Sequence, residues 1–349
     1  MSQLPPLSLH RLAPDAYASW DAYVLAQPQA TFFHRAGWQR IIETIFRHRT
    51  FFLYAARAGR IVGVLPLAQV NSRLFGNSLA SLPFAVYGGV VTDADDAEAA
   101  AMLEAEAERI ARELEVEHLE YRNVVSRHAD WPTQDLYVTF RREIFADEEA
   151  NLNAIPRKQR AMVRKGIKNG LRSEIETNVD NFFALYADNV HRHGTPAMPK
   201  RYFAALLAEF GADAEVLTAF GPDGKPLSSV LSFYFRDEVL PYYAGDHVDA
   251  RDLAANDFKY WELMRRACAR GLKVFDYGRS KQGTGSFAFK KNWGFEPQPL
   301  YYEYRLFKRD AIPQNNPNNP KYKLMIAAWQ RMPIVLANWL GPHIVRNLG

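Results

Sequence analysis

The order of the predicted elements constrains the fold most, because it occurs twice along the 349 residues. Each half reads helix, helix, strands with a hairpin, helix, strand, strand. The halves share negligible sequence identity, so the repeat exists in pattern only. We therefore predict an α/β (α+β) protein in which one fold is used twice, over 1–150 and over 151–309.

Apolar periodicity and turn residues place the individual elements. In the first half we predict helices at 15–26, 36–46 and 95–114, and strands at 50–56, 61–70, 85–91, 116–121 and 134–140. In the second half we predict helices at 155–171, 179–193, 200–210 and 254–270, and strands at 214–220, 227–235, 239–244, 272–277 and 300–307. Residues 310–349 are predicted to be a Pro- and Asn-rich linker followed by an apolar tail helix at 322–340.

A basic helix opens the second half. Residues 151–172 contain seven bases and no acid, whereas residues 93–120 contain eleven acids and two arginines. Arg160, Arg164 and Lys168 are spaced four apart and share a face, and Arg157 precedes them; Val163 and Ile167 are predicted to dock the helix. Such a face either binds phosphate, which suits arginine and lysine, or is simply solvated, and we favour phosphate binding.

A second cluster lies in FDYGRSKQGTGSFAFKKNWGF, residues 275–295. It follows a predicted buried strand, and ligands of open α/β sheets bind near the carboxyl ends of strands. Glycines allow the backbone to approach a ligand, and the basic residues carry positive charge. The candidate binding residues are Arg279, Ser280, Gly283, Gly285, Ser286 and Phe289, with Lys290 beside them. The alternative is an ordinary turn with Phe287 and Phe289 in the core.

A third cluster joins the end of a predicted strand to the start of a helix. Tyr242, Tyr243 and Asp246 end the strand, and Asp257 lies in the first turn of the helix. These side chains are suited to orient a small polar substrate, and Asp246 to act as a base. Each carboxylate has a capping alternative, since acids also stabilise helix N-termini.

Several other classes of protein are disfavoured. Cys268 is the only cysteine, which excludes an intrachain disulfide and fits a reducing compartment. Prolines interrupt the N-terminal segment where a signal peptide needs an apolar core, and no run reaches the roughly 18 apolar residues of a membrane span, so we expect a cytoplasmic protein. No phosphate loop or GxSxG motif occurs, and no histidine spacing indicates a metal site.

The segments PRKQRAMVRKGIKNGL, DYGRS with GTGSFAFKKNWGF, and NPKYKLMIAAWQRMP resemble proteins of the FemAB family. The resemblance extends from about Thr31 to Phe307 and is strongest to the group associated with exosortase/PEP-CTERM exopolysaccharide systems. It implies a tandem duplicated GNAT-like (acyl-CoA N-acyltransferase) fold, here with a C-terminal helical tail. It also implies acyl transfer to an amine of an envelope or polysaccharide precursor. Aminoacyl-tRNA or acyl-CoA would be the donor, without a tightly bound cofactor or a metal.

Phe289-Lys290 matches the family's Phe-Lys pair, whose lysine belongs to the transferase site. The resemblance thus makes Lys290 a candidate for stabilising the oxyanion or a donor phosphate, with Tyr243 and Asp246 for orienting or deprotonating the amine. No helical hairpin insert of the kind that some members use for tRNA is present. Two alternatives stay open: a CoA-dependent N-acetyltransferase on a sugar amine, and a non-catalytic RNA- or polysaccharide-complex adaptor.

The tail carries apolar residues on one side of its predicted helix, which Pro333 is expected to bend, and lysines and arginines flank it. Such a segment either docks on the body of the protein or makes a peripheral contact with an anionic membrane through 321–349. We favour docking, because the polar face is thin.

Overall fold

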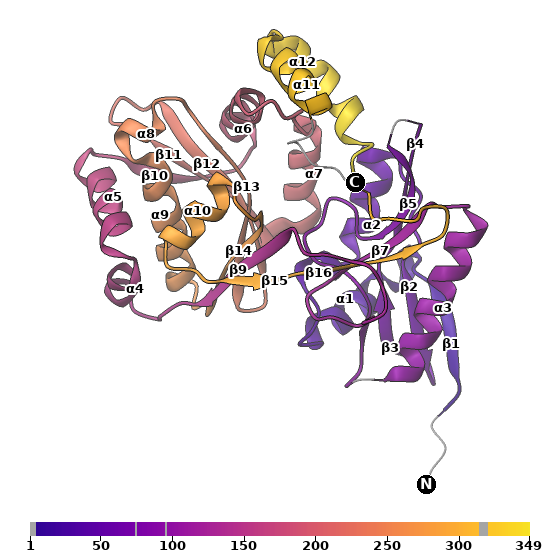
Figure 1. Cartoon of the computed structure of the whole chain (residues 1–349). Helices are drawn as coiled ribbons and strands as arrows, with labels where there is room; N and C mark the ends of the chain where they lie inside the picture. Colours follow the sequence, from indigo (N-terminus) through magenta and orange to yellow (C-terminus); the bar gives the residue numbers. More distant parts are fainter. Residues whose placement is uncertain (1–4, 74, 95, 314–319) are drawn as a thin grey trace. The chain divides into compact units, whose positions relative to one another are not determined.

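The computed structural model describes residues 5–73, 75–94, 96–313 and 320–349; for 320–324 it describes the backbone only. The chain forms two compact units (Figure 1). The first contains residues 1–135, 299–314 and 347–349, and the second contains 136–298 and 315–346. The predicted linker falls largely on 314–319, outside the described residues.

The first unit contains two sheets, of order β1-β2-β3-β6 and β4-β5-β7-β16-β8. Its strands are β1 (Leu7–Arg11), β2 (Leu53–Arg57), β3 (Arg60–Leu65), β4 (Ala68–Ser72), β5 (Gly76–Ser81), β6 (Val91–Thr92), β7 (His118–Asn123), β8 (Thr133–Gln134) and β16 (Tyr301–Leu306). Its helices are α1 (Tyr17–Ala26), α2 (Gly37–Ile41), which continues as a π-helical turn (Ile42–Phe46), and α3 (Ala97–Glu113). The apolar side of α3 packs on the core of this unit.

The second unit contains one sheet, of order β10-β11-β12-β13-β14-β9-β15. Its strands are β9 (Tyr137–Glu143), β10 (Arg172–Glu176), β11 (Ala214–Phe220), β12 (Pro226–Phe235), β13 (Glu238–Asp246), β14 (Val274–Lys281) and β15 (Pro297–Pro299). Its helices are α4 (Glu148–Ala154), α5 (Arg157–Lys168), α6 (Asp180–Arg192), α7 (Lys200–Phe210), α8 (Ala250–Leu253), α9 (Ala255–Ala269), α10 (Gly285–Asn292), α11 (Pro320–Arg331) and α12 (Ile334–Val345). Helix α9 packs on the sheet with α5 against it, and α6 contacts β12 and β13.

Two strands belong to a different unit from the one predicted by their place in the sequence. β9, within the expected first half, pairs with β14 of the second unit. β16, within the expected second half, pairs with β7 of the first unit. Buried Glu303 of β16 accepts hydrogen bonds from Asn123 and Ser126 of that unit, which helps to hold the strand there. The compact units therefore do not coincide with 1–150 and 151–309, because apolar alternation identifies a strand but not its partner.

Two predicted strands of the first half differ from the structure. The run 61–70 divides into β3 and β4, which belong to different sheets. Most of the run 85–91 is a buried loop, with only Val91 in β6. A Cβ added at Gly88 would lie 1.5 Å from the carbonyl oxygen of Ser81, and Gly89 has a φ of 94°. Close backbone approach therefore sets the conformation of this loop.

The tail forms two helices rather than the predicted one. α11 ends at Arg331 and α12 begins at Ile334, because Pro333 has no backbone N–H to continue the helix. Both α11 and α12 contact α6 (Figure 1). The docked face of α12 consists of Ala337, Gly341 and Val345. Leu336, which belongs to the apolar side of the single helix predicted for the tail, is exposed. In the part of the chain that the structure describes, no helix is long and apolar enough to cross a membrane.

Candidate active site

A gap opens between two parallel strands of the second unit. β13 and β14 pair only through Glu238 with Val274 and Val239 with Phe275, yet they continue to Asp246 and Lys281. β14 instead keeps pairing with β9 on its other edge, as far as Lys281 with Tyr137. Beyond Val239 and Phe275 the two strands no longer pair with each other. Such a gap at the carboxyl ends of parallel strands is where α/β sheets bind ligands.

Lys290 lies beside an irregular stretch of β14. The register between β14 and β9 shifts between Asp276 and Arg279. The Lys290 Nζ donates to the carbonyl oxygens of Tyr277, Gly278 and Arg279 at 2.7, 3.0 and 3.0 Å. Burial lowers the pKa of this ammonium to about 7, with nearby Asp276 opposing the shift and Arg279 adding to it. Lys290 thus supports the backbone, and it would contact a substrate only by exchanging one of these carbonyls.

Two buried hydroxyls lie on the same strand. The hydroxyl groups of Tyr277 and Ser280 have no hydrogen-bond partner among the described residues. Buried polar groups are normally paired, so an unpaired hydroxyl beside a gap is a candidate ligand contact. Sequence reasoning selected Ser280 but treated Tyr277 only as part of a buried strand.

The loop between β14 and α10 has open space beside its glycines. Nothing lies within 4 Å of a Cβ added at Gly283 or Gly285, and Ser286 is exposed. Thr284 caps the helix by accepting from the Phe287 backbone N–H. Arg279 is exposed and lies over the Tyr137 ring, 4.5 Å from its centroid. Phe289 is half-buried against Tyr260 and Trp293, so it packs as the core alternative expected.

Asp246 ends β13 in an ion pair that the sequence did not reveal. Its carboxylate lies 3.1 Å from the Nζ of Lys259 on α9 and accepts from the Ser228 hydroxyl. Lys259 is fully buried, and burial lowers its pKa while Asp246 opposes that shift. The burial of Lys259 could have been predicted from the sequence, because Ala255, Lys259, Leu263 and Ala267 repeat every four residues along the buried stripe of α9.

Tyr242 and Tyr243 contact other rings on the α6–α7 side of the sheet. The Tyr243 hydroxyl lies 3.1 Å from that of Tyr202 on α7, and its ring packs against Tyr186 on α6. Burial raises the pKa of Tyr243 well above 10, so the phenol stays protonated. Orientation of an amine fits this group, and proton removal does not. Tyr243 and Asp246 therefore face different layers, because Asp246 pairs with α9.

Asp257 joins three elements of the second unit. It accepts hydrogen bonds from the indole N–H of Trp293 at 2.9 Å and from the Gln159 amide at 3.4 Å. Burial raises its pKa despite these bonds. Its contacts are those of an anchor between α5, α9 and the end of α10.

The basic helix docks through small and neutral residues and leaves its charges outside. Gln159, Val163 and Gly166 are buried, and a Cβ at Gly166 would lie 2.8 Å from the Phe258 Cβ of α9. Ile167, predicted to dock, is 50% exposed, because the close α5–α9 approach turns the helix about Gly166 instead. Arg157, Arg164 and Lys168 are exposed, and Arg160 donates to the Asn153 side chain at 2.8 Å. Asn169 donates to the Leu253 carbonyl, which places the end of α5 beside the loop before α9.

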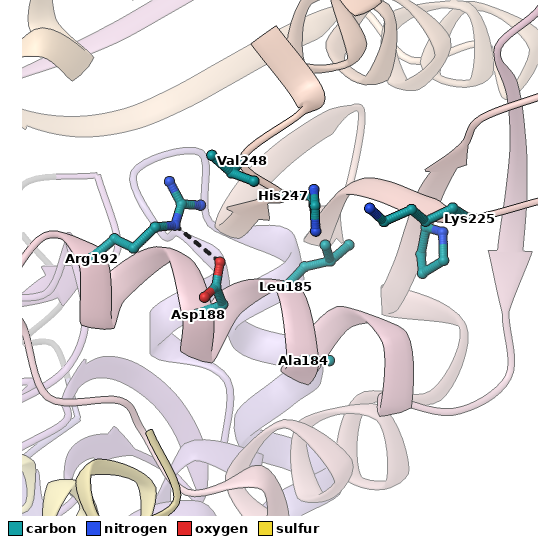
Figure 2. A pocket seen from close by; sticks show the side chains of 8 residues that line it. Ala184, Leu185, Asp188, Arg192, Lys225, His247 and Val248 are labelled. Atoms are coloured by element: carbon teal, nitrogen blue, oxygen red, sulfur yellow. Dashed lines mark hydrogen bonds and ion pairs between the residues drawn. The ribbon is translucent and has the colours of Figure 1, made fainter. Parts of the chain in front are cut away.

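A cavity of ≈ 610 Å³ lies beside the C-terminal end of β13, and none of the predicted site residues lines it. It is lined by Ala184, Leu185, Asp188, Arg192, Lys225, Pro226, His247 and Val248 (Figure 2). Arg192 pairs with Asp188 at 2.9 Å, and Lys225 pairs with Asp249 at 3.0 Å. Arg192 also donates to the Asp246 carbonyl oxygen, so the cavity adjoins the end of β13. Both apolar and charged side chains line it, which suits an amphipathic group.

Comparisons with known proteins show what the chain is similar to. Residues 157–291 match the family described as acetyltransferase (GNAT) domain. The UDP-N-acetylmuramoylpentapeptide-lysine N(6)-alanyltransferase of Weissella viridescens is 25% identical over 137 residues, which cover 38% of this chain and 40% of that protein. The chain thus matches well under half the length of that relative.

Solved structures extend the likeness of the fold to nearly the whole chain. FemX superposes with a TM-score of 0.68 at 16% identity, over 91% of this chain and 100% of the other. A tandem GNAT protein from the clavulanic acid pathway gives a TM-score of 0.55 at 13% identity, over 88% and 100%. The chain therefore has the GNAT acyltransferase fold in tandem. The similarity to the alanyltransferase and to FemX agrees with the FemAB resemblance drawn from the sequence.

Proposed function

We propose that this chain is an N-acyltransferase of FemAB type, which moves an aminoacyl or acyl group to an amine of a cell-wall precursor. The observation that carries the proposal is the gap between β13 and β14, flanked by Asp246 and Lys290, within the residues that match the GNAT domain. An exopolysaccharide precursor is the finer acceptor that we propose, on the sequence resemblance. We also propose that the protein is cytoplasmic and that residues 321–349 make a peripheral contact with a membrane.

The donor would lie along the gap with its phosphates toward α5. Exposed Arg157, Arg164 and Lys168 offer positive charge beside the loop that leads into α9. The chemical step joins the amine nitrogen to the donor carbonyl carbon and breaks the ester bond of an aminoacyl-tRNA or the thioester bond of an acyl-CoA. The amine's proton passes to a base, and the leaving oxygen or sulfur receives a proton.

Asp246 is the base that we propose, because its carboxylate is held in place by Lys259 and Ser228 at the strand end. Lys290 would stabilise the oxyanion or a donor phosphate, with the Ser280 hydroxyl as a further donor. The reacting amine would lie at Asp246, at the end of β13. On the α6–α7 side of the sheet, Tyr242 and Tyr243 would orient the remainder of the acceptor, and the cavity lined by Arg192 and His247 would hold it.

A side-by-side donor screen tests the function. The purified chain is incubated with acyl-CoA thioesters or charged tRNA and a pool of amine acceptors, and mass spectrometry follows donor loss and amide formation. We expect catalytic turnover with one donor class. A CoA-dependent reaction on a sugar amine would select the alternative enzyme, whereas saturable RNA or polysaccharide binding without turnover would contradict the proposal in favour of the adaptor.

Neutralising Arg160, Arg164 and Lys168 together to glutamine is expected to raise the donor Kd at least about tenfold at low salt. Hydrogen bonds to charged groups contribute about 1.5–3 kcal/mol each, and about 1.4 kcal/mol is tenfold. The salt dependence of binding should flatten as phosphate contacts are lost. Titration of the donor at two salt concentrations measures both effects.

The matched control neutralises exposed Arg236 and Lys273, which lie at the opposite end of the sheet. It should retain wild-type affinity at both salt concentrations. Unchanged affinity in the α5 variant would mean that its bases form only a solvated face.

A further inference from the structure

Helix α12 has one face fixed to the second unit. Ala337, Gly341 and Val345 are buried. A Cβ added at Gly341 would lie 3.0 Å from the carbonyl oxygen of Ala197, so a small residue is needed for this close approach. The helix contacts α6, as does α11 (Figure 1). Docking therefore orients α12 and leaves its opposite face open.

The open face is apolar. Val335, Leu336 and Trp339 are 80, 43 and 66% exposed. At 3.6 residues per turn these three positions lie on one side of the helix, opposite Ala337 and Gly341. Met325 on α11 is another exposed apolar side chain, at 58%. A gathering of large exposed apolar residues on one element indicates a partner surface.

The charge of the segment points to the kind of partner. Residues 311–349 contain no aspartate or glutamate, whereas Lys321, Lys323, Arg331 and Arg346 are all basic. Two such segments would repel each other in a dimer, but an anionic lipid surface attracts them. Tryptophan is favoured at the boundary between lipid and water. An amphipathic helix of this kind binds by inserting its apolar face among lipid headgroups.

We infer that α12 binds the surface of an anionic bilayer through Val335, Leu336 and Trp339, with the basic residues of the tail contacting lipid headgroups. The sequence left docking on the body and membrane contact as alternatives, and the two faces of α12 allow both at once. The Gln330 side chain of α11 donates to the Arg192 carbonyl, and the Arg192 side chain lines the cavity of the same unit. Binding of α12 to a bilayer would therefore bring the lipid surface close to α6, the helix that lines the cavity.

If the proposed function is correct, this contact brings the enzyme to an acceptor amine that is carried on a lipid-linked precursor. This role rests on the proposed function. The lipid contact itself needs neither donor nor acceptor. Vesicle binding and acyl transfer are therefore separate measurements, and each can fail without the other.

Cosedimentation of the full chain with vesicles tests the inference. The vesicles are phosphatidylcholine alone or equimolar phosphatidylcholine and phosphatidylglycerol. We expect at least about tenfold stronger binding to the anionic vesicles, weakened by salt. The double variant Val335→Ser, Trp339→Ser should lose at least about tenfold of that binding, because two apolar side chains no longer insert.

The control variant Leu25→Ser, Val125→Ser changes two exposed apolar residues of the first unit, 45 and 71% exposed, and should bind like the wild type. Equal binding of the α12 variant and the wild type would overturn the inference. So would a lipid-free dimer, seen by sedimentation velocity, that the α12 variant abolishes, because the face would then belong to a second copy. Loss of transfer to a soluble acceptor with vesicle binding intact would count against the proposed function alone.

Discussion

Replacing Lys290 with methionine is expected to lower turnover by about 10²–10³ under saturating donor, the usual effect of removing one group that stabilises an oxyanion. Methionine keeps the length of the side chain but removes the ammonium that now bonds three backbone carbonyls. The β14 backbone beside the gap would lose its support, and the site would lose a positive charge. Steady-state rates at saturating donor measure the effect.

The same contacts change the expected stability. The sequence alone predicts a melting temperature near that of the wild type, because it does not show where the Lys290 Nζ lies. Each unpaired buried carbonyl should cost about 1–3 kcal/mol, so three should cost about 3–9 kcal/mol, and roughly 2–4 °C is lost per kcal/mol in a unit of this size. Lys291→Met, at an exposed neighbouring position, should change neither quantity. A Lys290 variant that melts lower but turns over at the wild-type rate at 25 °C would make the residue structural.

Asp246→Asn is expected to lower turnover by about 10²–10⁴, the range attributed to general acid–base catalysis. Asparagine keeps an acceptor for the Ser228 hydroxyl but removes the negative charge beside Lys259. Because burial already lowers the pKa of Lys259, that side chain can become neutral when its partner is lost. Donor affinity should therefore change much less than the rate of the chemical step.

Asp237→Asn is the matched control, since Asp237 is exposed at the opposite end of the β12–β13 hairpin. It should leave the rate unchanged. If Asp246→Asn formed amide as fast as the wild type, Asp246 would only hold Lys259, and the base would lie elsewhere.

Local patterns were enough to predict most elements of the second unit. Helix α7 and strand β11 have the predicted bounds, Lys200–Phe210 and Ala214–Phe220. Strong periodicity and a glycine between them leave few alternatives. The GNAT fold class follows from the element order together with the FemAB resemblance, and the comparisons confirm it.

Contacts between distant segments were not predictable in this way. The exchange of β9 and β16 depends on which sheet edges are free, and alternation says nothing about that. The burial of Lys259 could be predicted from its place on the buried stripe of α9, but its carboxylate partner at the end of β13 could not. The gap itself arises because β14 pairs with β13 only at Val274 and Phe275 but stays paired with β9 as far as Lys281, and no single segment of the sequence predicts that divergence.

A single-turnover experiment with amine acceptors tests the central claim most directly. The chain, in excess over a donor labelled in its acyl group, is mixed with the acceptor pool, and label in free donor, hydrolysed acid and amide is followed by mass spectrometry. We expect the label to move to an amide, one acyl group per donor consumed, and the Asp246→Asn variant to bind the donor but to form this amide far more slowly. Donor that stays bound and intact with every acceptor, or that yields only free acid at equal rates in both proteins, would contradict the central claim.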